Sequence, residues 1–408
     1  LLPVDWDATT AGKATLGKNN MRINRIMALA YKGKALLWAG SPLMNWVSGG
    51  SKEYNTELCK RAADAFGQAL ALTESTNRYE LADFSEYNDI FLLHNSSGKL
   101  NGVKESIFME NIKDYSFRWR WNMVNDFRPQ SIESSGIKSY PTANYVNYYG
   151  MQNGYPINDM TKADAESGYD PTHPWKNRDP RFYKTIMFDG VKWRNTGGAG
   201  GTAELFTGGR ESEEANEKKG CFTAYMNSKL CPQLMNTFDG YKENNIMILS
   251  LMRLADVYLM YAEATAVGYN SPKGKAATYS LTAEEALNKI RERAGVAPVL
   301  EKFLGSTADF LSELRRERAV ELSFEGFRFT DLRRWMLLTQ YPYTLKTKIE
   351  FDRADPNNYN YDAPEENAIK NLREVVLIER KYTDRHYWYP LPKKDVSMYE
   401  GFYQNPGW

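Results

Sequence analysis

Apolar residues recur every three to four positions in two stretches near the start of the chain, which is the spacing of one face of an α-helix. The two faces comprise Ile23, Ile26, Met27, Ala30 and Leu37, and then Leu58, Ala62, Ala65, Phe66, Ala69 and Leu72. Small residues around one aromatic ring, as in AADAFGQAL (62–70), resemble a tetratricopeptide unit, because Ala or Gly lets two helices approach closely beside a bulky side chain. Residues 12–83 are therefore predicted to form a helical hairpin that serves as scaffold.

A second group of helices is predicted from about 246 to 340. The first of these helices has apolar residues three and one positions apart, namely Leu254, Val257, Tyr258, Tyr261 and Ala262. The next helix has Thr282 and Glu285 in the spacing of a capping box and Gly295 at its end. These signals predict a second helical-hairpin scaffold.

Charged residues dominate the last part of this group, LRRERAVELSFEGFRFTDLRRW (314–335). A helix should run into it from about Ser306 or Thr307 to Leu322, and a shorter one should follow from about Phe329 to Leu338. Opposite charges stand three positions apart in the pairs Glu313/Arg316, Arg318/Glu321 and Glu325/Arg328. The pattern predicts ion pairs beneath the fold. A phosphate site is disfavoured because no glycine-rich strand-to-helix turn accompanies the arginines.

Periodicity fades from 84 to 245, where Gly, Asn, Pro and aromatic residues take over. A segment this long without regular structure is usually functional or disordered, and the aromatic content argues against disorder. Between Tyr115 and Trp193, 16 of 79 residues are aromatic, about 20% against 13% for the whole chain. We place the ligand-binding face in this loop-rich subdomain. Residues 341–408 are expected to form an irregular C-terminal region.

The residue types in the loop-rich subdomain suit a sugar ligand. A pyranose ring has an apolar face of C–H groups and a rim of hydroxyls, so a receptor needs flat Trp or Tyr side chains for the face and Asn, Asp or Arg for the rim. Two short segments, FRWRWNMVNDFRP (117–129) and VKWRN (191–195), provide both. The candidate ligand-binding residues are Trp119, Trp121, Asn122, Asp126, Arg128, Tyr149, Trp193, Arg194 and Asn195. For any single aromatic residue, a place in the core is the commoner alternative.

Several motifs occur in an order that resembles one protein family. They are LMRLADVYLMYAEA (251–264), LNKIRERAG (287–295), ERAVELSFEGFRFTDLRRW (317–335) and QNPGW (404–408), with NRDPRF (177–182) as a further match. With them the chain resembles the SusD/RagB family, the surface proteins with which gut and oral Bacteroidetes hand nutrients to an outer-membrane transporter. Around 141–159 the chain departs from the family, because Ala143 and Tyr149-Gly150 replace a common Gln and a frequent acidic residue.

The resemblance implies a mainly α, SusD-like fold in which tetratricopeptide-like helical hairpins carry an irregular, loop-rich ligand-binding subdomain. It also implies a surface-exposed glycan-binding protein that captures an oligosaccharide and delivers it to a SusC-like TonB-dependent transporter. Family members are held on the extracellular face of the outer membrane by an N-terminal lipid. Because the family segment at 12–45 comes almost at once here, we expect the signal, the lipid-bearing Cys and the first part of the ligand face to lie upstream of Leu1. Peptide-binding RagB-like members leave a peptide ligand as the alternative.

Composition narrows the possible functions further. The 408 residues carry 52 Lys and Arg against 51 Asp and Glu, and the net charge of +1 gives no electrostatic footprint for nucleic acid or an acidic membrane. No apolar run reaches the roughly 18 residues that a membrane-spanning helix needs. Cys59 falls in a helical pattern as a small hydrophobe, whereas Cys221 and Cys231 either pair or stay free, since sequence alone cannot fix the geometry.

Two other classes of function remain to be weighed. A glycosidase needs two carboxylates across a sugar-binding groove, and Asp126, Glu133, Asp159 and Glu166 lie in the aromatic region, but no spacing marks a pair. No nucleophile elbow, His-containing triad signature or zincin motif occurs, so we assign no catalytic residue, cofactor or metal. A tetratricopeptide-type adaptor that binds a partner peptide is disfavoured, because repeat arrays need more neighbouring units than this chain provides.

Overall fold

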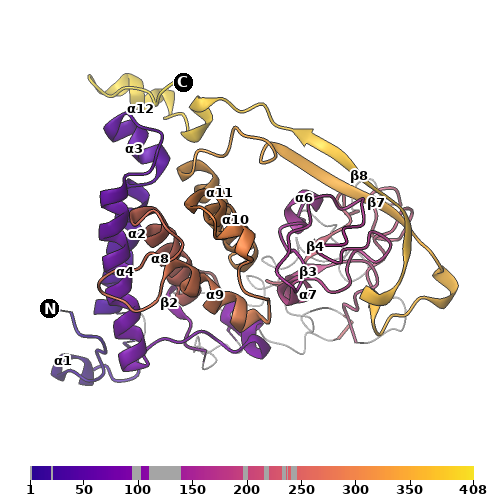
Figure 1. The fold of residues 1–408 in the computed structure, drawn as a ribbon, viewed down its shortest axis with the longest axis horizontal. Coiled ribbons are helices and arrows are strands. Elements are labelled where there is room, and N and C mark those ends of the chain that lie inside the picture. Colours follow the sequence, from indigo (N-terminus) through magenta and orange to yellow (C-terminus); the bar gives the residue numbers. More distant parts are fainter. Residues whose placement is uncertain are drawn as a thin grey trace.

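The helices and the loop-rich segments of the chain occupy different halves of the molecule (Figure 1). The computed structural model describes residues 2–19, 22–93, 103–109, 139–195, 201–215, 220–231, 236, 238–239 and 246–408. Both ends of the chain lie in the helical half, and a long two-stranded hairpin reaches from this half across the loop-rich half. Each half has a large apolar core of its own.

The first predicted hairpin is formed by α2 (Arg25–Ala39) and α4 (Thr56–Thr76), which pack along their length. The side chains of Asn24 and Asn55 cap them by accepting hydrogen bonds from backbone N–H groups of the first turn. Ile23 precedes this cap and is 55% exposed, so it is not part of the buried face.

Close contact between the two helices depends on one glycine. A Cβ atom added to Gly33 of α2 would lie 2.6 Å from a ring carbon of Phe66 on α4, which leaves room for hydrogen alone. This is the small-residue and aromatic packing expected of a tetratricopeptide-like unit.

The second helical group is built around α8 (Leu254–Gly268), which contacts α4, α9 (Ala283–Ala294) and α10 (Thr307–Glu321). Every residue of α8 is buried, so this helix has no open face on which a partner peptide could lie. The capping box at the start of α9 and the left-handed Gly295 (φ 72°) at its end are both present as predicted.

The last scaffold helix, α11 (Phe327–Arg334), begins and ends earlier than the sequence predicts. Gly326 precedes it in a left-handed conformation (φ 87°), and Met336 adopts another (φ 56°) just after it. These two left-handed residues mark the ends of the helix, so the predicted extension to Leu338 is wrong.

Buried ion pairs join the helices to each other and to the loop-rich half. Glu321 of α10 pairs with Arg181, Arg253 and Arg293, which come from three different elements. The other members of this buried ion-pair lattice near Glu321 are Glu105, Asp179, Lys229, Arg291, Glu313, Glu317 and Glu325. The lattice also includes a group around Arg318, formed with Asp256, Glu263, Asp331 and Arg334. The prediction of ion pairs beneath the fold is therefore confirmed.

The partners within this lattice differ from those that sequence spacing suggested. Of the three proposed pairs, only Glu313 and Arg316 bond to each other. Arg318 instead bonds to Asp256 and Asp331. These charges are buried, so they bond across helices, where a carboxylate can meet two or three cations, and not along one exposed helix face.

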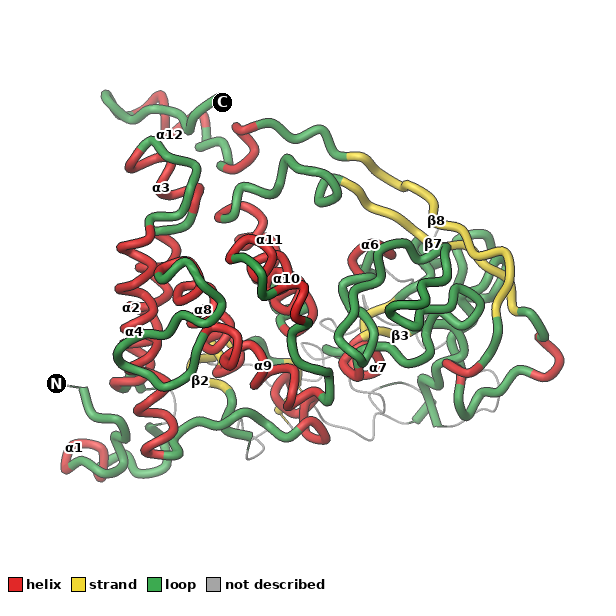
Figure 2. The backbone as a smooth tube through the Cα atoms, viewed as in Figure 1, coloured by secondary structure: helices red, strands yellow, loops and turns green. Residues whose placement is uncertain are grey.

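Two short antiparallel ladders join segments that are far apart in the sequence, and Figure 2 shows one of their strands, β2, among the helices. Strand β1 (Leu92–Leu93) pairs with β5 (Ile246–Met247), and β2 (Ser106–Met109) pairs with β6 (Ser250–Arg253), which runs directly into α8. Inside the loop-rich half lie α6 (Ala143–Val146), α7 (Pro180–Thr185), β3 (Ile186–Met187) and β4 (Met226–Asn227). Aromatic and sulfur-containing side chains fill its core, as expected where regular elements are short.

Residues 341–408 are not irregular, which corrects the sequence-based expectation. They contain the longest strands of the described chain, β7 (Leu345–Arg353) and β8 (Ile369–Glu379), paired as an antiparallel hairpin. Inward residues of β7 alternate and place Ile349 and Phe351 in the core of the loop-rich half, while β8 is mostly exposed. Residues on both faces of β8 are exposed, so its sequence does not alternate between apolar and polar positions.

The remaining helices are short. Near the chain ends, α3 (Pro42–Gly49) contacts the C-terminal region through the small cluster of Leu43, Met336, Leu338 and Tyr387, close to α12 in Figure 1. The others are α1 (Thr10–Lys13), α12 (Lys393–Met398) and the 3₁₀ turns η1 (Phe84–Phe91), η3 (Glu301–Phe303), η4 (Pro356–Asn358), η5 (Pro364–Glu366) and η6 (Asp384–Tyr387).

Cys59, Cys221 and Cys231 are all buried and none forms a disulfide bond, so the possible pairing of the last two is not formed in this structure. Burial raises the pKa of the Cys59 thiol to about 12, in keeping with its expected role as a small core residue. In the part of the chain that the structure describes, no helix has the length and apolar character needed to cross a membrane.

Candidate functional site

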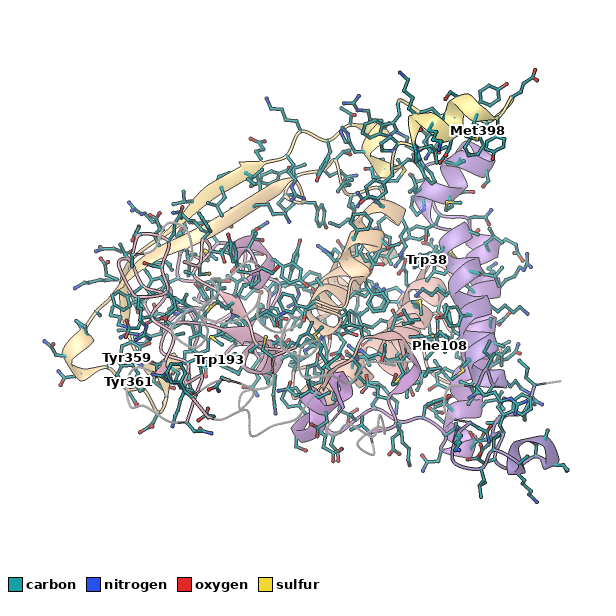
Figure 3. All side chains as sticks on the ribbon, turned by 180° about the vertical axis from the view of Figure 1, so that it is seen from behind. Trp38, Phe108, Trp193, Tyr359, Tyr361 and Met398 are labelled. Carbon is teal, nitrogen blue, oxygen red and sulfur yellow. The ribbon has the colours of Figure 1, made fainter. Side chains whose placement is uncertain are left out.

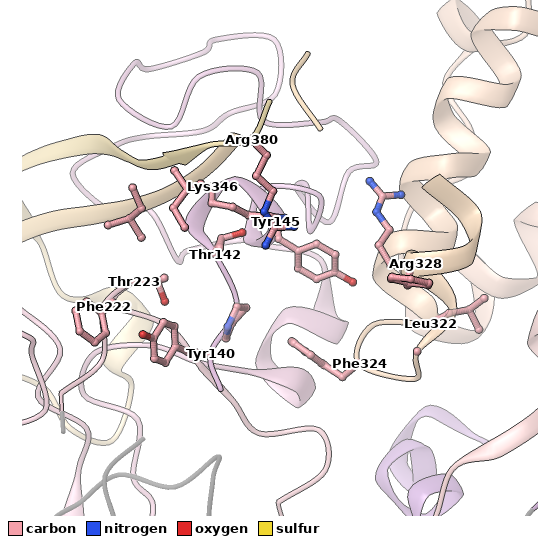
Figure 4. A pocket seen from close by; sticks show the side chains of 15 residues that line it. Tyr140, Thr142, Tyr145, Phe222, Thr223, Leu322, Phe324, Arg328, Lys346 and Arg380 are labelled. Atoms are coloured by element: carbon pink, nitrogen blue, oxygen red, sulfur yellow. The ribbon is translucent and has the colours of Figure 1, made fainter. Parts of the chain in front are cut away.

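A hollow of about 740 Å³ opens where the two halves and the hairpin meet (Figure 4). Its walls come from the start of α6, a loop near residue 222, the corner between α10 and α11, and the β7–β8 hairpin. The lining residues are Tyr140, Pro141, Thr142, Tyr145, Phe222, Thr223, Leu322, Phe324, Gly326, Arg328, Phe329, Lys346, Leu377, Ile378 and Arg380. The cavity and its lining residues together are called the hollow.

Half-buried aromatic rings form much of its wall. Tyr140 stacks on Phe222 with ring centroids 5.8 Å apart, and Tyr145 lies against Phe324 at 6.0 Å. Burial raises the pKa of the Tyr140 hydroxyl to about 12, so this group stays protonated and can donate a hydrogen bond. Flat rings with hydroxyls at their edges suit a ligand that has both apolar faces and polar rims.

The corner between α10 and α11 is held in an unusual backbone conformation. Phe324 has a φ of 62°, which is rare for a bulky residue and costs about 1–3 kcal/mol. Gly326 follows with a φ of 87°, a value that glycine adopts freely. The strained corner points the Phe324 ring at the hollow while the neighbouring Glu325 enters the buried ion-pair lattice.

The hairpin contributes neighbouring side chains that a regular strand would place on opposite faces. Lys346 pairs with Ile378 and Thr347 with Val376, so Leu377 is an extra residue in the ladder. Such a bulge redirects side chains, and both Leu377 and Ile378 line the hollow. They are 36% and 53% exposed, so an apolar rim faces solvent.

Three cations line the hollow and none of its described lining residues is acidic. They are Arg328 of α11, Lys346 of β7 and Arg380 just after β8. Burial is the main cause that lowers the pKa of Lys346 to about 8, and the nearby Arg380 and Arg328 act in the same direction. In the described chain Arg328 lies over the rings of Tyr148 and Tyr343, and Arg380 donates to the hydroxyl of Tyr382. Neither arginine nor Lys346 forms an ion pair with a described carboxylate.

Two of the predicted ligand-binding aromatics lie in the core, which corrects their expected role. Tyr149 is fully buried, and its hydroxyl accepts a hydrogen bond from Thr185 at 2.8 Å. Trp193 is 3% exposed and belongs to the same apolar cluster (Figure 3). In this conformation neither ring can stack on a ligand, because tertiary packing already covers both faces.

Arg194 and Asn195 lie at the edge of this core, away from the hollow. The Arg194 guanidinium stacks on Phe238 at 3.7 Å from the ring centroid, and the backbone N–H of Asn195 donates to Asp239 at 3.1 Å. The Asn195 side chain is exposed. The structure therefore does not bring these two residues together with the hollow.

The other predicted residues, Trp119, Trp121, Asn122, Asp126 and Arg128, lie outside the described residues. Their part in ligand binding stays a prediction.

Asp159 and Glu166, two acidic residues of the aromatic region, are engaged in a turn and in an ion pair. Asp159 accepts hydrogen bonds from Thr161, and its bond with Lys162 is the main reason that its pKa falls to about 2. Glu166 pairs with Lys302 at 3.2 Å. Among the described residues no three His, Cys, Asp or Glu side chains gather in a way that could hold a metal ion.

Sequence reasoning missed the hollow because its residues come from five separated segments. Lys346 and Arg380 lie 34 positions apart and meet only through the hairpin. If the sequence had predicted the β7–β8 hairpin, it would also have predicted that the like charges of Lys346 and Arg380 lie close together across two strands.

The model of the SusD family matches residues 104–408 of the chain. Among solved structures, the chain is similar to a SusD-like protein from Bacteroides fragilis, with a TM-score of 0.69 and 20% identity over 100% of this chain and 68% of that one. It is also similar to a SusD-like carbohydrate binding protein from Bacteroides fragilis, with a TM-score of 0.62 and 19% identity over 97% of this chain and 66% of that one.

A third similar structure is surface glycan-binding protein A from Bacteroides fluxus, with a TM-score of 0.53 and 18% identity over 100% of this chain and 66% of that one. The chain thus spans about two thirds of the length of these structures. No curated protein matches it. At these identities the likeness speaks for the fold, and the predicted SusD-like arrangement of helices and loop-rich subdomain is confirmed.

Proposed function

Because the chain belongs to the SusD family, we propose that it is a surface glycan-binding protein that captures an oligosaccharide in the hollow. The observation that carries this proposal is the hollow itself, which is open to solvent and has aromatic walls. Its volume of about 740 Å³ is within the usual range for small-molecule sites. Two of the similar proteins are a carbohydrate binding protein and a surface glycan-binding protein, which supports the same ligand class here.

The chemistry of the walls favours binding over catalysis. Tyr140 and Phe222 offer flat faces to the C–H side of a sugar ring, and Thr142 offers a hydroxyl near them. Among the described lining residues there is no carboxylate that could serve as the acid or base of a glycosidase. The captured sugar would leave the site unchanged.

After capture, the oligosaccharide would pass to a SusC-like TonB-dependent transporter in the outer membrane. The protein would be held on the extracellular face by an N-terminal lipid and would act as a lid over that transporter. This step rests on family membership alone. Trp119, Trp121, Asn122, Asp126 and Arg128 are proposed as further ligand contacts.

An oligosaccharide array probed with the purified chain tests the proposal. We expect binding to fall about 5-fold or more in the variants Tyr140→Ala and Phe222→Ala, since each stacked sugar ring contributes about 1 kcal/mol or more. Tyr403→Ala is the matched control, because this tyrosine is 83% exposed and lies outside the hollow. Trp119→Ala and Trp121→Ala extend the test to the predicted segment.

If the protein binds peptides but no oligosaccharide, the glycan ligand is rejected and the RagB-like alternative, a peptide ligand, is favoured. Glycan binding that survives both hollow variants but is lost in Trp119→Ala would move the site out of the hollow. Thermal unfolding of each variant shows whether a loss of binding is only a loss of fold.

A further inference from the structure

Most of the buried cations in the described chain contact carboxylates, although Arg178 contacts backbone carbonyl oxygens in their place. Arg181, Arg253 and Arg318 are each at least 97% buried, and each contacts two or more acidic side chains. Arg353 likewise pairs with the buried Asp189 at 2.7 Å. A half-buried cation without such a partner is costly, because burial removes water and provides no opposite charge in return.

Three cations at the hollow have no such partner: Arg328 and Lys346 are half-buried, and Arg380 is exposed at its edge. Arg328, Lys346 and Arg380 come from three separate segments, yet they line one cavity and have no ion pair within the described chain. Three acidic residues are sequence neighbours of its wall. Glu321 and Glu325 are already bonded within the buried ion-pair lattice. Glu379 is exposed and stands opposite Leu345 in the ladder, and it does not line the hollow.

Two of these cations are set against each other by the hairpin. Lys346 stands opposite Ile378 in the ladder, and the backbone N–H of Arg380 donates to Thr344 at 3.0 Å. Lys346 and Arg380 are therefore diagonal neighbours on one face. Like charges that close together across two strands are unfavourable, which is a cost that an anion between them would remove.

We infer that the oligosaccharide proposed for the hollow carries an acidic substituent, a carboxylate or a sulfate, and that Arg328, Lys346 and Arg380 bind it. The inference rests on the proposed function and deepens it by naming the ligand class. Guanidinium groups bind carboxylate and sulfate oxygens through paired hydrogen bonds, and an ammonium adds a compact charge. The aromatic walls would then hold the sugar ring that carries the anion.

This arrangement also predicts how the ligand lies. Tyr140 and Phe222 form one end of the hollow, while Arg328 belongs to the α11 side, and Figure 4 shows Lys346 and Arg380 entering from the hairpin above. An acidic sugar would place its ring on the aromatic end and its anionic group beneath the hairpin.

Matched ligands on an array provide the test. Uronic acid oligosaccharides are compared with their carboxyl-reduced neutral counterparts, and sulfated oligosaccharides with the desulfated chains. We expect one acidic series to bind at least about 10-fold more tightly than its neutral counterpart, because a lost charge-assisted hydrogen bond is worth about 1.5–3 kcal/mol. The comparison of the two series identifies the kind of anion.

The variant Lys346→Met should erase most of that preference, and Arg328→Gln and Arg380→Gln should each reduce it. Lys370→Met is the control, since it makes the same charge change at an exposed residue of β8 outside the hollow. Equal binding of acidic and neutral ligands, or a preference unchanged in Lys346→Met, overturns the inference and leaves the glycan-binding proposal intact. Binding of acidic peptides and of no oligosaccharide overturns both.

Discussion

Positively charged side chains have acidic partners in the buried ion-pair lattice but none in the hollow. In the lattice, Arg253 contacts Glu105 at 2.5 Å and Glu321 and Glu325 at 2.8 Å, so its burial is offset by three carboxylates. In the hollow, Lys346 has cations and aromatic rings as its neighbours. Most interior cations already have carboxylates, so three cations that line one cavity without any make the hollow the candidate site for an external anion.

Two lysines show the difference most directly. Burial lowers the pKa of both Lys229 and Lys346 to about 8. For Lys229 the lowering is opposed by Glu325, which bonds to its ammonium at 2.8 Å, and backbone carbonyls complete its contacts. For Lys346 every neighbouring charge acts in the same direction as burial. Lys229 is held by an acidic partner within the fold, whereas Lys346 has no anionic partner in the described chain.

Breaking the lattice should have the largest effect on stability. The variant Glu321→Gln keeps the shape of the side chain but leaves Arg181, Arg253 and Arg293 without their shared carboxylate. Loss of one member of a buried ion pair costs about 3–5 kcal/mol. Urea unfolding at pH 7 should show a loss in the free energy of unfolding within this range.

The control for the lattice is an exposed pair. Lys52 and Asp384 lie 3.1 Å apart at the surface, and Lys52→Ala should change the free energy of unfolding by less than about 1 kcal/mol. A Glu321→Gln protein as stable as this control would show that the lattice does not hold the two halves together.

The aromatic residues of the loop-rich half should divide in the same way into core and hollow. Trp193→Ala removes a buried indole from the core and should cost about 3 kcal/mol of stability. Tyr140→Ala should cost less, because the ring is half-buried, but should weaken ligand binding. Thermal unfolding beside array binding separates the two effects. A strong binding defect in Trp193→Ala without loss of stability would restore the sequence-based assignment.

The sequence predicts the helical half well because its signals are local. The capping box of Thr282 and Glu285 and the left-handed Gly295 involve residues close in the chain, and all three appear as expected. The loop-rich half gives weaker signals, because its aromatic residues can serve either as core or as ligand contacts. Trp193 and Tyr149 serve as core. The sequence pattern alone cannot distinguish aromatic residues of the core from those that contact a ligand. Both kinds occur in segments that show neither the helical nor the strand repeat.

The hollow could not be predicted because it depends on pairing between distant residues. The pairing register of β7 and β8 decides that Lys346 and Arg380 share a face, and a single bulge decides that Leu377 and Ile378 both line the cavity. The strained Phe324 corner depends in turn on the lattice that holds Glu325. Each of these is a consequence of the assembled fold.

The smallest effect on stability, and the sharpest test of the comparison, should come from Lys346→Met without ligand. This variant removes an unpaired charge and keeps an unbranched side chain in its place. We expect a gain in the free energy of unfolding of about 1 kcal/mol or less at pH 7, in the range of other changes that relieve unfavourable charge. The opposite sign would mean that the ammonium stabilises the empty hollow.

The pH dependence of this gain follows from the lowered pKa of Lys346. In the unfolded chain the ammonium titrates near 10.5, and in the folded protein near 8. Below about pH 8 both states are protonated, so the folded protein carries the whole cost of the charge. Between pH 8 and 10.5 the folded state releases its proton first and the cost declines. The stability difference between Lys346→Met and the parent protein should therefore be largest at pH 7 and smaller at pH 9.5, as unfolding curves at the two pH values can show. A difference that does not change with pH would assign the gain to packing and leave the charge of Lys346 without consequence for the fold.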